Sequence, residues 1–71
     1  MLTLDMVDSG SVKIISLRCG SALRSRLREL GIYEGSTIKI VKNDFCCPLI
    51  LMVKGSKVAL GRGQARKIIV Q

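Results

Sequence analysis

The stretch SALRSRLRELGIYEGSTIKI, residues 21–40, decides the fold class that this sequence predicts. It carries an apolar stripe at the helical spacing i, i+4 and i+7, formed by Leu23, Leu27 and Leu30. Ser21 is expected to cap the first turn of this helix with its hydroxyl, and Gly31 to end the helix in the left-handed conformation. We therefore expect one short amphipathic helix in this part of the chain.

Short strand patterns lie on both sides of this helix. Five runs have the alternation or the β-branched content of strands, and they are Ser11–Arg18, Thr37–Lys42, Leu49–Lys54, Lys57–Leu60 and Lys67–Val70. A two-residue link at Gly55-Ser56 predicts a hairpin, and Gly61–Arg66 has room for one helical turn. Together these patterns predict a mainly β fold, a small SH3-like antiparallel barrel of about five strands with one inserted amphipathic helix.

The length and composition fit one small soluble domain. With 71 residues the chain has room for a single barrel domain spanning residues 1–71. Its core must be aliphatic, because Tyr33 and Phe45 are the only aromatic residues. The longest apolar run, Cys46–Val53, is far shorter than the roughly 20 residues that a membrane-spanning helix needs. We expect a cytoplasmic protein that does not itself span a membrane.

The charge of the chain is strongly positive. Twelve basic and five acidic residues, with no histidine, give a formal net charge of +7. Such an excess attracts acidic partners, although solubility alone explains it equally well. Small barrels that bind nucleic acid interleave basic residues with stacking aromatic side chains, and that pattern is missing here. Nucleic acid is therefore not an expected partner.

The residue inventory gives little support to catalysis. Histidine is the most frequent general acid or base, and the chain has none. The five acidic residues are scattered over turns and the helix face, with nothing to bring a pair of them into one cleft. A nucleophilic cysteine needs a nearby base, for which only lysine and arginine are available. We expect a protein that is not an enzyme and has no catalytic residues.

The cysteines raise the question of a metal site. Cys46 and Cys47 are adjacent in a predicted loop and could supply two ligands, with Cys19 as a possible third. Thiolates are soft ligands for transition metals, but structural zinc sites space their cysteines further apart, because adjacent thiols do not easily face one ion. Free thiols that act as small apolar side chains near a loop are the simpler interpretation. No metal site or cofactor is firmly implied, and a weak site for iron or zinc is the alternative.

The arginines of the predicted helix differ in their expected surroundings. Arg26 lies beside the leucine stripe, so its aliphatic stem is expected to pack over the end of the barrel. Arg24 and Arg28 are one turn apart and are expected to be more exposed, where their like charges mildly disfavour the helix. A solvated face and an acidic partner surface explain this pair equally well.

Residues along nearly the whole chain resemble those of the FeoA family of bacterial ferrous iron uptake. The resemblance rests on the run Ala22-Leu23-x-x-Arg26-Leu27-x-x-Leu30-Gly31-Ile32-x-x-Gly35-x-x-Ile38. It continues through Gly10, Pro48, Gly55, Ala59-Leu60 and Ala65-x-x-Ile68-x-Val70. The resemblance implies an SH3-like barrel with an inserted helix, similar to the C-terminal domain of iron-dependent repressors of the DtxR type.

The function that the resemblance implies is an accessory one. FeoA-like proteins are small and cytoplasmic, and the implied partner is FeoB, the membrane Fe(II) transporter with a cytosolic G-protein domain. This chain would then be a non-enzymatic adaptor of ferrous iron uptake. The alternative is a regulatory module that binds a transition metal through its loop cysteines. The residues expected to contact the partner are Arg24, Arg28, Phe45, Cys46 and Cys47.

The chain departs from the family pattern in two segments. The loop before the third strand, often a Gly-Asp-Pro turn in relatives, reads Phe45-Cys46-Cys47-Pro48 here. The segment Arg62–Lys67, which often carries glutamates in relatives, is basic or neutral. An apolar anchor such as Phe45 would supply affinity for a partner, whereas the surrounding charge would act on association rate and orientation.

Overall fold

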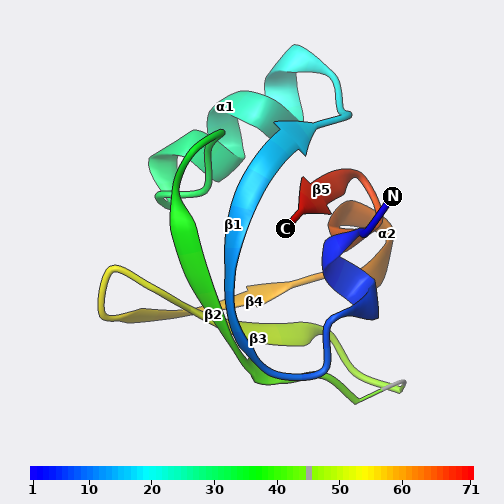
Figure 1. Ribbon diagram of the computed structural model, residues 1–71. Coiled ribbons are helices and arrows are strands. Elements are labelled where there is room, and N and C mark those ends of the chain that lie inside the picture. Colours follow the sequence, from blue (N-terminus) through cyan, green and yellow to red (C-terminus); the bar gives the residue numbers. More distant parts are fainter. Residues whose placement is uncertain (45) are drawn as a thin grey trace.

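The computed structural model describes residues 1–44 and 46–71 as one curved antiparallel sheet with short helices at its ends (Figure 1). Its strands are β1 (Gly10–Leu17), β2 (Thr37–Lys42), β3 (Leu49–Val53), β4 (Ser56–Leu60) and β5 (Ile68–Val70). They lie in the order β4-β3-β2-β1-β5. The helical elements are the 3-10 helix η1 (Leu4–Met6), α1 (Ser21–Glu29) and α2 (Arg62–Ala65). The mainly β, SH3-like fold predicted from the sequence is confirmed.

The strand β1 holds the two parts of the sheet together. Its first half, Gly10–Lys13, pairs with β2, and its second half, from Ile14 to Leu17, pairs with β5. The register shifts between Ile14 and Ser16, and a similar shift occurs in β2. Such bulges bend a strand and increase its twist, so that a sheet of a few short strands can wrap around its own core. In Figure 1, β1 runs almost the full height of the molecule and ends next to α1.

The core inside this sheet is aliphatic, as the composition predicts. Leu4 of η1 is completely buried and closes one side of the sheet. The buried apolar residues are Leu4, Val12, Ile14, Leu17, Leu27, Ile32, Ile38, Ile40, Leu49, Leu51, Val53, Leu60, Ala65, Ile68 and Val70. Burying one such aliphatic side chain stabilises the fold by about 1.5–3 kcal/mol. The chain therefore builds its core without using Tyr33, which is only half-buried.

The two ends of α1 differ from each other in how well the sequence predicts them. The cap residue is Gly20, and no side-chain hydrogen bond caps the helix, so the prediction that Ser21 is the cap is wrong. The chain enters the helix from an extended Gly20, which leaves Ser21 one residue inside. At the other end, Gly31 has a φ of +95° as predicted. The amides of Gly31 and Ile32 donate to the carbonyls of Arg28 and Leu27, which is the Schellman arrangement.

The hairpin between β3 and β4 lies one residue earlier than the sequence predicts. Its two link residues are Lys54 and Gly55, with φ values of 51° and 83°, and Val53 pairs with Ser56. The prediction of a Gly55-Ser56 link is therefore wrong. A two-residue turn that matches the strand twist requires a positive φ at both central positions. Lys54 takes this conformation beside the glycine, so that Ser56 is free to begin β4.

Candidate functional site

The residues predicted to contact a partner lie at two ends of the molecule. Arg24 and Arg28 belong to α1, whereas Cys46 and Cys47 lie in the loop between β2 and β3. Figure 1 shows α1 at the top and this loop at the bottom of the same view. The structure therefore does not bring the two groups into one surface. Phe45, the fifth predicted contact residue, lies outside the described residues.

Arg24 is engaged within the protein. Its Nη2 donates a hydrogen bond of 2.7 Å to the carbonyl oxygen of Leu17 at the end of β1, and its Nη1 lies 3.9 Å from Oε1 of Glu34. Arg24 is half-buried, whereas Arg26 is exposed, which reverses the expected order. The reason is the Leu17 carbonyl, because a backbone acceptor at a strand end requires a donor. Arg24 thus ties α1 to β1.

Arg28 remains at the surface beside the corner that follows α1. It is exposed, and with Tyr33 and Glu34 it lines a shallow depression of about 350 Å³. The ammonium group of Lys54 lies 5.1 Å from the centre of the Tyr33 ring, within the range of a cation–π interaction. This depression therefore combines an aromatic ring with charges of both signs.

A small apolar groove lies on the side of α1 that faces β4 and α2. Its volume is about 70 Å³. The residues of this α1 groove are Leu23, Arg26, Leu27, Leu30, Ala59, Leu60 and Gln64. Leu27 forms the floor, with 1% of its surface exposed, whereas Leu30 is 44% exposed. The sequence locates the leucine stripe, but that stripe alone does not show that β4 and α2 form the opposite wall.

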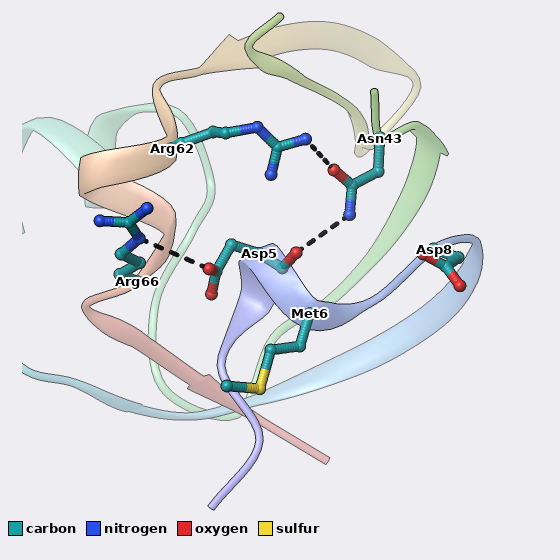
Figure 2. A pocket seen from close by; sticks show the side chains of 6 residues that line it. All are labelled: Asp5, Met6, Asp8, Asn43, Arg62 and Arg66. Atoms are coloured by element: carbon teal, nitrogen blue, oxygen red, sulfur yellow. Dashed lines mark hydrogen bonds and ion pairs between the residues drawn. The ribbon is translucent and has the colours of Figure 1, made fainter. Parts of the chain in front are cut away.

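A polar pocket of about 460 Å³ lies at the other end, lined by Asp5, Met6, Asp8, Asn43, Arg62 and Arg66 (Figure 2). The Nδ2 of Asn43 donates to the carbonyl oxygens of Asp5 and Val7 at 3.1 and 2.6 Å. Arg62 donates to Oδ1 of Asn43 and to the carbonyl oxygen of Asp44. Arg66 forms an ion pair with Asp5 at 3.6 Å. These contacts join η1, the β2–β3 loop and α2, which makes this pocket a structural clamp.

The thiols of Cys46 and Cys47 are both exposed and lie together. Their sulfur atoms are 3.2 Å apart, and the amide of Cys47 donates to the carbonyl oxygen of Asp44. The hydrogen bond between the two thiols, together with the nearby charge of Cys46, raises the pKa of the Cys47 thiol. Both positions are free thiols, as the sequence predicts, and the two adjacent sulfur atoms lie on the same side of the loop. Cys19, in contrast, packs partly against the core.

The described residues do not complete a metal centre by themselves. Among residues 1–44 and 46–71, no group of three or more cysteine, aspartate or glutamate side chains is placed to hold one ion. In the same part of the chain, no helix has the length and apolar character that crossing a bilayer requires.

Comparison with known proteins matches residues 2–71 to the FeoA domain family. A Methanocaldococcus jannaschii protein named "Putative Fe(2+) transport protein A" is 43% identical over 60 residues, covering 84% of this chain and 70% of that protein. A crystal structure of an iron uptake regulatory protein (FeoA) superposes with a TM-score of 0.88 at 25% identity, covering 99% of this chain and 93% of that one. The manganese-activated repressor ScaR, in its apo form, gives 0.87 at 26% identity over 99% of this chain and 34% of the repressor. The match to FeoA structures and to one part of a repressor confirms both resemblances seen in the sequence, and the chain belongs to the FeoA domain family.

Proposed function

We propose that this protein is a non-enzymatic accessory protein of ferrous iron uptake that docks on the cytosolic part of a FeoB-type Fe(II) transporter. The observation that carries the proposal is the FeoA domain match over residues 2–71, together with 43% identity to a protein named for Fe(2+) transport. Docking requires a complementary surface rather than catalytic groups. All three cysteines are free thiols, which fits a reducing cytoplasm.

The docking surface of this proposal is the end of the molecule that carries α1. Leu30 offers a half-exposed apolar anchor at the rim of the α1 groove. Arg26 and Arg28 are exposed on the same helix, and the whole chain has a net charge of +7. Apolar anchors in small pockets supply most of the affinity of an interface, whereas rim charges act on the association rate and on orientation. An acidic partner face with an apolar residue at its centre complements this surface.

The proposed surface includes only part of the predicted set of contact residues. Arg28 stays in the proposed surface because it is exposed beside Tyr33 and Glu34. Arg24 leaves it, because its guanidinium is bonded to the Leu17 carbonyl. Reversing the charge of Arg24 would disturb the contact between α1 and β1, and the result would report on the fold rather than on the partner.

The test is a binding measurement between this chain and the cytosolic G-protein domain of the transporter. In low salt, Arg28→Glu is expected to weaken binding by about five- to tenfold, mostly through a slower association rate. Leu30→Ser is expected to raise the dissociation rate. Lys42→Glu is the matched control, because it makes the same charge change at the far end of β2. No binding by the unaltered chain would refute docking, and equal effects of Arg28→Glu and Lys42→Glu would refute the α1 surface.

A further inference from the structure

The geometry of the β2–β3 loop points to a metal-binding site that the docking surface does not use. We propose that the thiols of Cys46 and Cys47 form a two-thiolate site for a divalent transition-metal ion, with Zn²⁺ bound more tightly than Fe²⁺. The site lies at the opposite end of the molecule from α1 (Figure 1), so it is independent of the docking proposal.

The distance between the two donor atoms suits a chelate. The sulfur atoms of Cys46 and Cys47 lie 3.2 Å apart, on the same side of the loop. Two sulfurs bound to a tetrahedral Zn²⁺ at about 2.3 Å each are about 3.8 Å apart. Small rotations of two exposed side chains supply the difference of about 0.6 Å. The pair is therefore close to the geometry of a chelate before an ion arrives.

Oxidation of this pair to a disulfide competes poorly with metal binding. The Cα atoms of adjacent residues are about 3.8 Å apart across a trans peptide, and the chain has no cis peptide bond among its described residues. Disulfides usually join Cα atoms that are about 4.4–6.8 Å apart, so a bond between neighbours is strained. In a reducing compartment the two thiols stay available as soft donors, which suits a transition metal.

Hydrogen bonds hold the base of the β2–β3 loop in place. Asn43 is bonded to two backbone carbonyls of the segment around η1, and its own Oδ1 accepts from Arg62. Arg62 also donates to the carbonyl of Asp44, whose oxygen accepts from the amide of Cys47. Pro48, directly after the pair, has a fixed φ. Binding an ion at this position then costs less conformational entropy than at a free loop.

Two thiolates make an open metal site rather than a closed one. The described residues place no third ligand with this pair, and the whole chain has no histidine. A structural zinc site is closed by four protein ligands, whereas a site with fewer protein ligands keeps open positions. The open positions here face solvent, where water or a ligand of another molecule can occupy them. The pair is thus suited to exchangeable binding rather than to holding the fold together.

The test uses Co²⁺ as a spectroscopic probe on the fully reduced chain. We expect a thiolate-to-cobalt charge-transfer band that saturates at no more than one ion per chain and that Zn²⁺ displaces more readily than equimolar Fe²⁺. Thiolate ligands bind a metal ion in competition with protons, so the apparent affinity is expected to rise from pH 6 to pH 7. Cys46→Ser and Cys47→Ser are each expected to abolish the band.

Cys19→Ser serves as the matched control, because Cys19 is a free thiol that packs partly against the core and lies in the link to α1. This variant is expected to keep both the band and its pH dependence. Circular dichroism of the two loop variants should match the unaltered chain, since both positions are exposed. The absence of a band, its survival in either loop variant, or its loss in Cys19→Ser would overturn the proposal.

Discussion

Gly31 and Val53 are packed so closely that a Cβ atom on the glycine would lie 2.9 Å from Cγ1 of the valine. This contact places the corner after α1 directly against the end of β3. Gly31 also has a φ of +95°, which side-chain-bearing residues rarely adopt. The same glycine thus ends the helix and lets the helix approach the sheet. The position of α1 over the core therefore depends on both the positive φ of this glycine and its close contact with the sheet.

Substitution of Gly31 by alanine tests this relationship against a matched site. Gly35 has a nearly identical φ of +92°, but nothing lies within 4 Å of a Cβ built there. Gly35→Ala should therefore cost only the backbone strain, about 1–2 kcal/mol of unfolding free energy. Gly31→Ala adds overpacking against Val53 and should cost about 2–4 kcal/mol. Urea denaturation measures the unfolding free energy of both variants. Equal losses would show that the Val53 side chain moves aside at no cost in free energy.

Leu27 and Leu30 are expected to differ in their contribution to stability, because Leu27 is buried and Leu30 is exposed. Leu27 is 1% exposed and sits in the core, so Leu27→Ala should lower the unfolding free energy by about 2–5 kcal/mol. Leu30 follows the helix and is 44% exposed, so Leu30→Ala should change stability by less than about 1 kcal/mol. Thermal and urea unfolding of the two variants provides the comparison. A large loss in Leu30→Ala would mean that all three leucines belong to the core after all.

Much of the fold could be predicted because local rules and packing agree in this chain. The range Thr37–Lys42 is a strand both in the sequence pattern and in the structure, since its alternate residues Ile38 and Ile40 point into the core. Gly31 has the left-handed conformation that its place after the last leucine predicts. The sequence pattern predicts the hairpin link one residue too late, because nothing in the sequence indicates that Lys54 has a positive φ.

The site residues were harder to predict because their partners come from distant segments. The contact of Arg24 with the Leu17 carbonyl depends on where β1 ends relative to α1, which no local pattern encodes. In the same way, Asn43 reads as a turn residue in the sequence, yet it bonds to backbone carbonyls more than thirty residues earlier in the chain. The two loop thiols likewise lie on the same side because of the shape of the loop, and the hydrogen bonds of Asn43 hold that shape.

Cys47 allows the loop geometry to be tested by pH. The hydrogen bond and the charge of Cys46 raise the pKa of Cys47, whereas Lys42 lowers it. Only the thiolate is alkylated by iodoacetamide, so a raised pKa means less thiolate and slower reaction at a given pH. In Cys46→Ala the Cys47 rate profile should therefore move to lower pH, and in Lys42→Ala it should move to higher pH. Mass spectrometry of the loop peptide measures the rate at each pH, and coincident profiles for Cys46→Ala and the unaltered chain would show that the two thiols do not touch in solution.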